Sequence, residues 1–386
     1  MSITPKPFYL KILKYTPTGK MVGTLKALIL AGGFGTRLRP LSCTRPKILF
    51  PIVNRSLLHR ILLRLDQGGI QEAVLAVDLK TELYIKQIGL PDLGLKISYS
   101  RDPPKQPLGT GGPIKKAEKK IGHQDSFLVL NGDILAHLDY NEIINQHRRK
   151  NAVATLALHP VEDPSRYGAV KITKDRKITR FIEKPSTGSG ATNLINAGIY
   201  VLDPEVFEYL PKDQKVSIER EIFPKLAEEG GLYGYVFESL WADIGTIKGY
   251  REIHKTLLNA RPGIQKSNWG GEIKIKSPVD IGDRVSIDGK SVIGPYTVLG
   301  QNVTVERNVS IEDSIIFPGA KISDSSSIHG AVIGEKAVIG KGAKISEGCV
   351  LGDSVKIDDN VTLSRGVTVC AAKRVSESVL TTQNII

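Results

Sequence analysis

An aliphatic residue recurs at every sixth position after about residue 260, as in IGDRVS, IGPYTV and LGQNVT. A fixed short period of this kind indicates a repeat architecture. The pattern slips in phase near residues 317 to 333 and then resumes. The aliphatic positions are Ile281, Ile287, Ile293, Leu299, Val305, Ile311, Ile333, Ile339, Ile345, Leu351, Ile357, Leu363 and Val369. Three six-residue strands per turn would stack these side chains inside a triangular prism.

Glycines recur beside the aliphatic positions and predict the corners of this prism, because a residue without a Cβ tolerates sharp turns. They include Gly282, Gly294, Gly300, Gly334, Gly340 and Gly352. The pattern resembles the left-handed β-helix of hexapeptide repeats. A solenoid of this kind usually serves assembly or regulation, so we expect it to pair the subunits of a homo-oligomer.

Before the repeat, short apolar runs alternate with helix-like stretches, which predicts a mixed, mainly parallel α/β sheet of the Rossmann-like type with helices on both faces. The leucines of SLLHRILLRL (56–65) have helical spacing. The predicted buried strands are LKALIL (25–30), EAVLAV (72–77), KISYS (96–100) and FLVLNGD (127–133).

A second group of apolar runs is more closely spaced and predicts an antiparallel insertion or lid. Its members are VATLAL (153–158), YGAVKI (167–172), TRFIE (179–183) and INAGIYVL (195–202). A helix is predicted to begin at Ser217, which can cap it. A full capping box would need Glu or Gln where Arg220 stands.

The chain has 386 residues, which is long for one hydrophobic core. We therefore expect an N-terminal extension (1–24), an α/β domain (25–259) and a β-helix domain (260–386). The net charge of +13 favours anionic partners, and phosphorylated small molecules suffice. The basic runs at 115–120 and 148–150 are predicted on solvated helix faces, so no nucleic-acid partner is expected.

Three scattered cysteines, Cys43, Cys349 and Cys370, fit neither a disulfide framework nor a cysteine zinc site. They favour a reducing, cytoplasmic location. No apolar run approaches the roughly 20 residues of a membrane-spanning helix, and the first twenty residues lack the apolar core of a secretory signal. We expect no membrane partner.

Residues 31–47, AGGFGTRLRPLSCTRPK, directly follow a predicted strand. Glycines let backbone N–H groups converge on phosphate oxygens, although GGFG alone could be a tight turn between a strand and a helix. Arg37 and Lys47 decide between the two, because the intervening prolines stiffen the segment so that two cations can face one polyphosphate. The segment is not a Walker loop. It predicts a triphosphate site.

This segment resembles the signature GGxGTRLxPLTxxxPK of the nucleoside-diphosphate-sugar pyrophosphorylases, with Ser42 in place of Thr. Residues 106–113, QPLGTGGP, resemble the family's base-binding loop PLGTAGP, with Gly111 replacing Ala. The triplets EKP (183–185) and NAG (196–198), the pair YG (167–168) and WADIG (241–245) resemble further motifs of the family. The resemblance covers about residues 25 to 386.

The resemblance implies a role for each matching residue. Asp133 ends an apolar strand, where α/β sheets place ligands, and it could also simply cap a helix. With Asp243 it is implied to hold Mg²⁺, and Lys184 is implied to hold the sugar phosphate. The implied catalytic residues are Arg37, Lys47, Asp133, Lys184 and Asp243; nucleotide-binding residues are Ala31, Gly32, Gly33, Gly35, Thr36, Gln106, Gly109 and Thr110; sugar-binding residues are Gly168, Glu183, Lys184 and Asn196.

Within the family, GGFGTRLRPL, INAGIYVLDP, SIEREIFPKLA, WADIGT and the last eighteen residues are most similar to the mannose-1-phosphate guanylyltransferases. This implies the conversion of mannose 1-phosphate and GTP into GDP-mannose and pyrophosphate. A phosphate monoester is mostly dianionic at neutral pH, so no general base is needed. We expect direct in-line attack on the α-phosphorus, without a covalent intermediate.

Three alternatives stay open. The first is the same chemistry with UTP or dTTP and glucose 1-phosphate. The second is a non-catalytic subunit like the exchange-factor subunits of translation initiation, which resemble the family in both domains but tend to lose the charged catalytic positions that stand here. The third, acyl transfer in the repeats, has little support, because His329 is their only histidine and a lone histidine is more often structural.

Overall fold

The computed structural model describes residues 25–33, 35–103, 108–185, 192–260 and 272–385. The predicted extension, residues 1–24, lies outside these ranges. The described residues form two compact units. We call residues 25–33 and 57–243 the sheet unit, and residues 35–56, 244–260 and 272–385 the β-helix unit. Within the described part, none of the helices has the length and apolar character needed to cross a membrane.

The sheet unit contains all the predicted strands of the α/β domain. Its strands are β1 (Lys26–Leu30), β4 (Glu72–Val77), β5 (Lys96–Arg101), β6 (Phe127–Asn131), β7 (Ile134–Ala136), β8 (Ala154–Pro160), β9 (Gly168–Ile172), β10 (Ile178–Glu183), β11 (Leu194–Leu202), β12 (Leu232–Val236) and β13 (Trp241–Asp243). Its helices are α1 (Leu57–Gln67), α2 (Leu79–Ile88), α3 (Gly111–Ile121), α4 (Tyr140–Lys150), α5 (Val206–Tyr209) and α6 (Phe223–Glu229), the last preceded by a π-helical turn, η5 (Ile218–Ile222).

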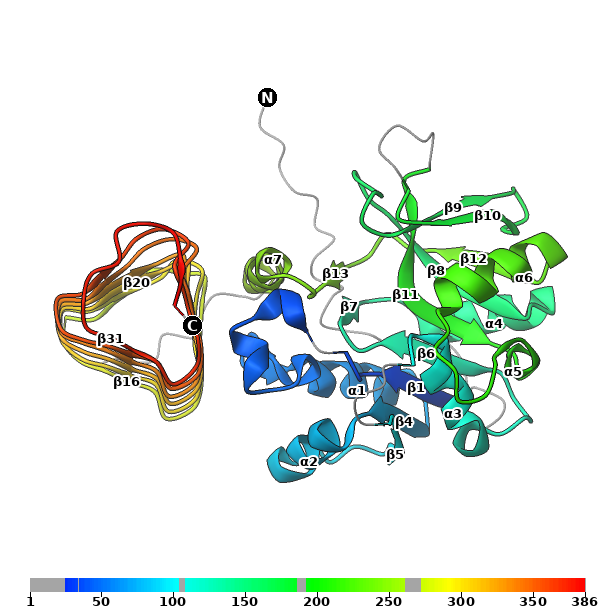
Figure 1. The fold of residues 1–386 in the computed structure, drawn as a ribbon, viewed down its shortest axis with the longest axis horizontal. Coiled ribbons are helices and arrows are strands. Elements are labelled where there is room, and N and C mark those ends of the chain that lie inside the picture. The colour runs from blue at the N-terminus through cyan, green and yellow to red at the C-terminus, as the bar shows by residue number, and fades with distance from the viewer. Residues whose placement is uncertain (1–24, 34, 104–107, 186–191, 261–271, 386) are drawn as a thin grey trace. The chain divides into compact units, whose positions relative to one another are not determined.

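Nine of these strands form one mixed sheet with the order β10-β9-β11-β6-β1-β4-β5, and β8 pairs with both β11 and β12 (Figure 1). Strands β6, β1, β4 and β5 are parallel, as predicted. The closely spaced strands are antiparallel, but they are not a separate insertion. The long strand β11 pairs with β6, β8 and β9, so these strands extend the main sheet.

Helices cover both faces of this sheet. Ile114 of α3, Phe207 of α5 and Leu226 of α6 share one core cluster with alternate strand residues such as Leu156. Thr155 faces the opposite side, because successive strand residues alternate, and it hydrogen-bonds His147 of α4 at 3.0 Å. The three-layer arrangement predicted from the sequence is therefore present.

The helix predicted to begin at Ser217 starts with a π-helical turn. The Ser217 hydroxyl accepts the Arg220 N–H at 3.3 Å, as a capping residue should. The reciprocal bond, which Arg220 cannot make, comes from Glu221, whose carboxylate accepts the Ser217 N–H at 2.8 Å. The wider π-helical turn shifts the position of the capping acid by one residue.

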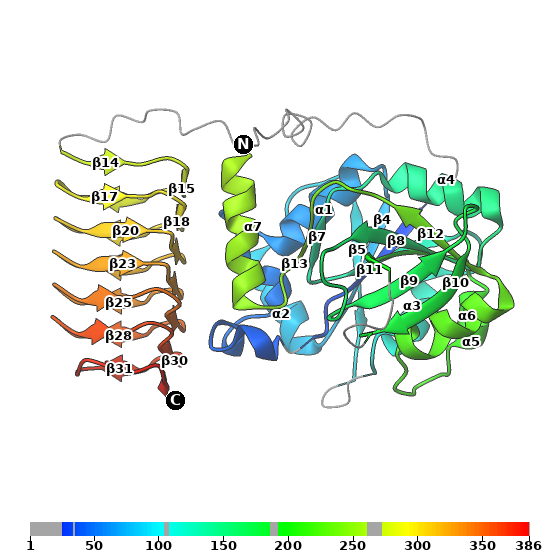
Figure 2. The same ribbon diagram turned by 90° about the horizontal axis from the view of Figure 1, so that it is seen from above.

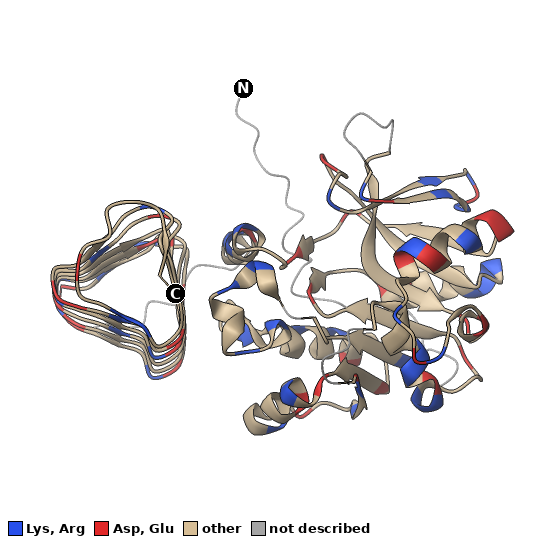
Figure 3. Cartoon of the chain, in the orientation of Figure 1, with Lys and Arg blue, Asp and Glu red and all other residues tan. Residues whose placement is uncertain are grey.

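The basic runs that we predicted on solvated faces lie on α3 and α4, and none of their lysines or arginines is buried. Acidic and basic residues are interspersed over both units (Figure 3).

The β-helix unit begins with three short 3-10 turns, η2 (Thr36–Leu38), η3 (Leu41–Cys43) and η4 (Lys47–Leu49), and a hairpin of β2 (Pro51–Ile52) and β3 (Arg55–Ser56). Helix α7 (Ile247–Asn259) follows later in the chain. Its further strands are β14 (Lys274–Ile275), β15 (Val279–Ile281), β16 (Ser286–Ile287), β17 (Val292–Ile293), β18 (Thr297–Leu299), β19 (Thr304–Val305), β20 (Ser310–Glu312), β21 (Ile315–Ile316), β22 (Lys321–Ile322), β23 (Ser327–His329), β24 (Val332–Ile333), β25 (Val338–Ile339), β26 (Lys344–Ile345), β27 (Val350–Leu351), β28 (Lys356–Ile357), β29 (Thr362–Leu363), β30 (Thr368–Val369), β31 (Arg374–Val375) and β32 (Asn384–Ile385).

These strands stack as three parallel sheets around a triangular cross-section, as the hexapeptide pattern predicts (Figures 1 and 2). The predicted aliphatic residues fill the interior. The corner at Gly334 needs glycine because of close stacking, since a Cβ there would lie 2.5 Å from the Gly352 carbonyl carbon. Gly334 is not needed for a left-handed backbone, because that conformation is adopted two residues later by Lys336, and by the equivalent Ser354 one turn on.

The predicted slip in phase near residues 317 to 333 is confirmed, and the strands continue through it without interruption. Ile316, Ile322 and Ile328 continue the buried row. Ile293 pairs with Ile311, eighteen residues on, whereas Ile311 pairs with Ile328, seventeen residues on. The slip is therefore two one-residue deletions at corners, one between β20 and β21 and the other between β23 and β24.

One side of the prism differs from the other two. The sheet β15-β18-β21-β24-β27-β30-β32, here called the docking sheet, points buried apolar residues outward: Val298, Ile315, Val332 and Val350. The corresponding positions of the other sheets include exposed Lys344 and Lys356. Because apolar side chains are stabilised by burial, the docking sheet requires a cover.

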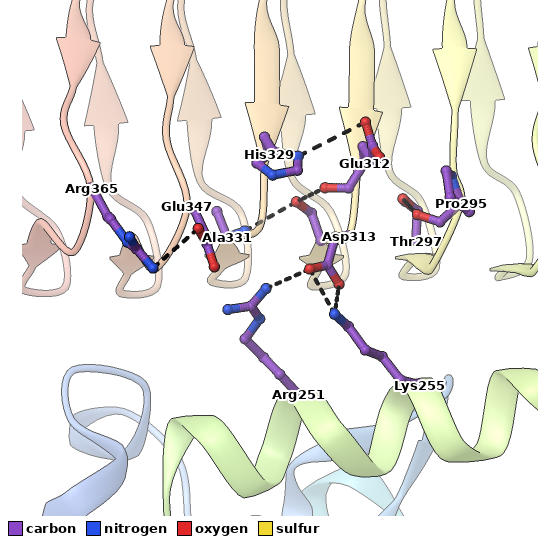
Figure 4. Close-up of polar contacts among 11 residues, drawn as sticks. Arg251, Lys255, Pro295, Thr297, Glu312, Asp313, His329, Ala331, Glu347 and Arg365 are labelled. Atoms are coloured by element: carbon purple, nitrogen blue, oxygen red, sulfur yellow. Dashed lines mark hydrogen bonds and ion pairs between the residues drawn. The ribbon is translucent and has the colours of Figure 1, made fainter. Parts of the chain in front are cut away.

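Residues 35–56 and α7 provide this cover. Arg251 and Lys255 of α7 reach Asp313, each at 2.8 Å (Figure 4). The Asn54 amide donates to the Leu299 carbonyl at 2.9 Å. The ring of Phe317 packs edge-on against both Phe50 and Tyr250. Phe317 occupies the corner position that Gly334 holds one turn later, so the repeat is modified where the cover lies.

Candidate functional site

Asp133 and Asp243 are brought close together by the short ladder between β7 and β13. Asp243 pairs with Ile134, the residue directly after Asp133. The turn before Asp133 is tight, because Gly132 donates to the Leu30 carbonyl at 2.8 Å and a Cβ on Gly132 would approach that oxygen to 2.7 Å. Both carboxylates thus lie beyond the carboxyl ends of β1 and β6, where α/β sheets bind ligands.

Two carboxylates suit Mg²⁺ only if the substrate completes the coordination. Among the described residues, no group of three or more His, Cys, Asp or Glu side chains that could hold a metal is found. Mg²⁺ commonly binds through one or two carboxylates together with substrate phosphates and water. Asp133 and Asp243 fit that pattern of one or two carboxylates completed by the substrate.

The predicted sugar residues gather on β9, β10 and β11. Gly168 pairs with Glu183, and a Cβ on Gly168 would lie 2.8 Å from the Glu183 carboxylate. Ile195 pairs with Ala169, which places Asn196 at the same end of the strands. Burial, reinforced by the charge of Glu219, raises the pKa of Glu183 above its ordinary value.

Lys184 has a left-handed backbone with φ of 55°, and its N–H donates to the Tyr167 carbonyl at 2.9 Å. A lysine in this conformation is strained by about 1 kcal/mol or more, and such strain tends to concentrate at functional sites.

The bend in β11 links the sugar residues to the carboxylate pair. The pairing register shifts between Asn196 and Tyr200, and the Asn196 side chain accepts the Gly198 N–H at 3.0 Å. The Trp241 indole donates to the Ala197 carbonyl at 3.0 Å. Because Trp241 begins the strand that ends at Asp243, the two groups of predicted residues are joined by one hydrogen bond.

The loop that follows Leu108 is tied to the segment before α6. Gly109 has φ of 72°, and a Cβ there would lie 2.3 Å from the Val216 carbonyl oxygen, so only glycine fits. Gly111 donates to the same oxygen at 2.9 Å. Thr110 is therefore held against the start of the helix at Ser217.

Glu219 is a residue whose importance the sequence analysis missed. Its carboxylate accepts hydrogen bonds from the hydroxyls of Thr110, Ser217 and, at 3.3 Å, Tyr200. Tyr200 in turn accepts the Asn196 side-chain amide at 3.1 Å. Glu219 thus connects a predicted nucleotide residue with a predicted sugar residue. Its place in the first turn of a helix is also explained by the helix dipole, so sequence alone did not single it out.

Asp102 is a second residue that the sequence analysis missed. It follows β5 directly, and a Cβ on Gly32 would lie 2.7 Å from its carboxylate. The other carboxylate oxygen is buried and has no hydrogen-bond partner among the described residues. Burial raises the pKa of Asp102 to about 6. The available sequence signal was the same as for Asp133, an acid directly after an apolar strand.

The later half of residues 31–47, the segment predicted to bind triphosphate and here called the phosphate segment, belongs to the β-helix unit. A Cβ on Gly35 would lie 3.5 Å from the Lys47 Cβ, so the turns η2 and η3 fold Lys47 back beside Gly35. The Ser42 hydroxyl donates to the Gly35 carbonyl at 2.7 Å, which a threonine at this position would also do. Arg37 is exposed.

The sheet unit thus brings together Ala31 and Gly32 at the end of β1, the carboxylate pair and the sugar residues, whereas Gly35, Thr36, Arg37 and Lys47 belong to the β-helix unit. Gly33 is exposed. Gln106 lies outside the described residues. The roles of all these residues remain predictions.

Two proteins of known name are similar to the chain over more than half of its length. A rice protein (Oryza sativa subsp. japonica) named probable mannose-1-phosphate guanylyltransferase 1 is 39% identical over 232 residues, which are 58% of this chain and 63% of that protein. A Yarrowia lipolytica protein named mannose-1-phosphate guanyltransferase is 36% identical over 268 residues, which are 68% of this chain and 72% of that protein. The match therefore spans less than two thirds of the rice relative.

The crystal structure of HddC from Yersinia pseudotuberculosis complexed with GMP-PN has a TM-score of 0.52 and 30% identity, and the match covers 60% of this chain and 99% of HddC.

Two family models together match most of the sequence. The model described as GMPPB C-terminal domain matches residues 275–386. The model described as nucleotidyl transferase matches residues 26–260, well over half of the chain. The chain therefore belongs to the nucleotidyl transferase family.

Proposed function

We propose that this protein is a sugar-1-phosphate nucleotidyltransferase that converts mannose 1-phosphate and GTP into GDP-mannose and pyrophosphate. The observation that carries the proposal is the pairing of β7 with β13, in which Asp243 lies opposite Ile134, the residue that follows Asp133. The hydrogen bond from Trp241 joins this pair to the Asn196 triplet. The names of the rice and Yarrowia relatives and the GMP-PN complex of HddC support this choice of base and sugar.

The chemistry follows from bringing two polyanions together. An oxygen of the sugar phosphate attacks the α-phosphorus in line, and the bond from that phosphorus to the departing pyrophosphate breaks. The sugar phosphate is already dianionic, so the protein does not need to remove a proton. Arg37, Lys47 and Lys184 would position and neutralise the phosphates, as phosphoryl-transfer sites chiefly do. Mg²⁺ held by Asp133 and Asp243 would supply further charge neutralisation.

Two other functions compete with this one. The same carboxylate pair and cations would serve UTP or dTTP and glucose 1-phosphate equally well. A non-catalytic subunit would not need Arg37, Lys47, Asp133, Lys184 and Asp243, and all five are present.

The experiment is a substrate panel. The protein is incubated with Mg²⁺, each of GTP, UTP, dTTP and ATP, and mannose or glucose 1-phosphate, and pyrophosphate release is measured. We expect release with GTP and mannose 1-phosphate, and none from Asp133→Asn prepared in the same way, which excludes a contaminating host enzyme. Faster release with another pair would overturn the choice of substrates, and silence with every pair would overturn the enzyme proposal.

Three further assignments belong to this proposal. The domain boundary near residue 260 and a cytoplasmic location, which the separate free cysteines favour, are two of them. The third is a homo-oligomer formed through the two sides of the β-helix other than the docking sheet. A monomeric mass in light scattering would exclude the oligomer.

A further inference from the structure

The segment that carries Lys47 is bonded directly to the β-helix through Thr44 and Arg45. The Arg45 guanidinium forms ion pairs with Glu335 and, at 3.0 Å, with Asp353. The Thr44 hydroxyl donates to the same Asp353 oxygen at 2.6 Å. The Arg45 guanidinium also lies over the Phe317 ring, 5.1 Å from its centroid. We call Thr44, Arg45, Glu335 and Asp353 the clamp.

Both carboxylate oxygens of Asp353 accept hydrogen bonds. Its Oδ1 accepts the Glu335 N–H at 2.7 Å, and its Oδ2 accepts Thr44 and Arg45. Glu335 and Asp353 stand at equivalent corners of consecutive β-helix turns, directly after the stacked Gly334 and Gly352. The repeat therefore fixes the backbone at both corners and, through the Glu335 N–H, the Asp353 carboxylate. The Glu335 side chain, 31% exposed, completes the acidic pair that faces the planar, five-donor side chain of Arg45.

The clamp is largely shielded from water. The Arg45 and Asp353 side chains are 15% and 13% exposed. Burial opposes the charge of Arg45, but Asp353 and Glu335 outweigh it and raise the pKa of the guanidinium. A buried ion pair contributes little net stability compared with apolar packing, and it is better suited to fixing one geometry.

We propose that Arg45 is a positioning residue for Lys47, and that the β-helix, acting through Asp353 and Glu335, fixes where the Lys47 ammonium meets the triphosphate. Only Pro46 separates the two residues, and its ring fixes its φ. Little freedom therefore remains between the clamped guanidinium and the backbone of Lys47. This inference rests on the proposed function, because it takes Lys47 as a triphosphate ligand.

The competing explanation is that the clamp only holds the cover on the docking sheet. The chain provides a matched control for this, since Asp313 receives Arg251 and Lys255 on the same side of the β-helix (Figure 4). Among the described residues, the side-chain partners of Asp313 are these two residues of α7 and none of residues 35–47. Asp353→Asn and Asp313→Asn each replace one carboxylate that bonds two side chains of the cover. In Asp353→Asn, the amide NH₂ must face a donor in either orientation.

The experiment compares the full-length wild type, Asp353→Asn and Asp313→Asn. Steady-state kinetics are measured while GTP and mannose 1-phosphate are varied separately, GTP binding is measured by calorimetry, and Tm is recorded. We expect Asp353→Asn to lower kcat/KM for GTP by about ten- to a hundredfold and to weaken GTP binding, because small misplacements of a positioning group cost that much. KM for mannose 1-phosphate should change less than about twofold. Asp313→Asn should lower Tm but keep both kinetic constants.

A second variant separates charge from geometry. Arg45→Lys keeps the positive charge but loses the planar fork, and Arg45→Met loses both. We expect the two variants to have similar Tm values and to be equally defective toward GTP. Full recovery of the GTP constants by Arg45→Lys would show that a charge alone suffices and would overturn the positioning role.

Equal effects of Asp353→Asn and Asp313→Asn on the GTP constants and on binding would also overturn it. If the wild type is silent with every substrate pair but binds GTP, the proposed function fails while the binding comparison still decides on the clamp. If the wild type neither reacts nor binds GTP, both proposals fail.

Discussion

The Thr110 hydroxyl donates a hydrogen bond to the Glu219 carboxylate, and this bond joins the loop before α3 to the helical turn η5, more than a hundred residues away in the sequence. Tyr200, fully buried, donates to the other oxygen of the same carboxylate. A glutamate that accepts three hydroxyls can hold a loop in one position without touching substrate, which gives Glu219 a testable role.

Replacement of Glu219 by Gln should lower kcat/KM for both substrates by about tenfold, since one acceptor is lost at a buried network and an unpaired group costs about 1–3 kcal/mol. The matched control is Glu221→Gln, which makes the same chemical change at a carboxylate that accepts the Ser217 N–H, a bond that the glutamine oxygen can still accept. Steady-state kinetics with each substrate varied provides the measurement. A result in which both variants lose only stability would contradict the network's role.

Replacement of Arg37 by Ala should remove about 3 kcal/mol of transition-state stabilisation, roughly a hundredfold in kcat/KM, which is the usual cost of losing one preorganised donor. The control is Arg39→Ala, because Arg39 is also exposed and lies two residues away. Near-normal turnover of Arg37→Ala would rule out its proposed role.

Removal of divalent metal should abolish turnover, and Mg²⁺ should restore it. In Asp243→Asn, one of the two carboxylates proposed to hold the metal loses its charge, so the Mg²⁺ concentration for half-maximal rate should rise by about tenfold or more. Titration of the rate with Mg²⁺ measures this directly. If the variant and the wild type require the same Mg²⁺ concentration, Asp243 does not hold the metal.

The stability of the protein should depend on pH through Asp102. Its pKa is raised to about 6 by burial, against about 3.9 for an unfolded aspartate. Between these values the folded state holds a proton that the unfolded state has lost, so the free energy of unfolding falls as pH rises from 4 to 6. The cost is fully present above pH 6, and solvent screening limits it to about 1 kcal/mol.

Asp102→Asn cannot ionise and should therefore gain stability relative to the wild type as pH rises from 4.5 to 7.5. Urea unfolding of both proteins at the two pH values measures this difference, and Asp92→Asn, at an exposed position, is the control. An equal gain in both variants would show that the effect is not specific to Asp102.

The elements of the fold could be predicted from the sequence because their signals are local. The apolar run at 72–77 coincides with β4, and the six-residue period yields a prism with the predicted residues inside. The prediction of a separate lid was wrong because it depended on which distant strands pair with one another. β11 bends at Asn196 and joins the main sheet to β9, so the expected lid is an extension of that sheet, and no local pattern distinguishes the two.

The candidate site shows the same division. Asp133 and Asp243 were singled out by short motifs, but their adjacency depends on pairing across more than a hundred residues. Asp102 and Glu219 carried no distinctive local pattern, because acids after strands and in first helical turns are common. Arg45 was passed over as part of a signature, since its partners Glu335 and Asp353 lie almost three hundred residues away.

The irregular coil that contains Asp313 and Phe317 defines one position along the β-helix at which the cover can pack. Successive coils of a parallel β-helix repeat at the strand spacing of about 4.8 Å, so a prism of identical coils would offer the same surface at every level, and a partner helix could settle one coil too high or too low. The corner at Asp313 is one residue short, and Phe317 follows it at only one level. The next coil toward β24 also has a shortened corner, but Gly334 stands there in place of Phe317, so a shift of one coil would separate the cover from the Phe317 ring.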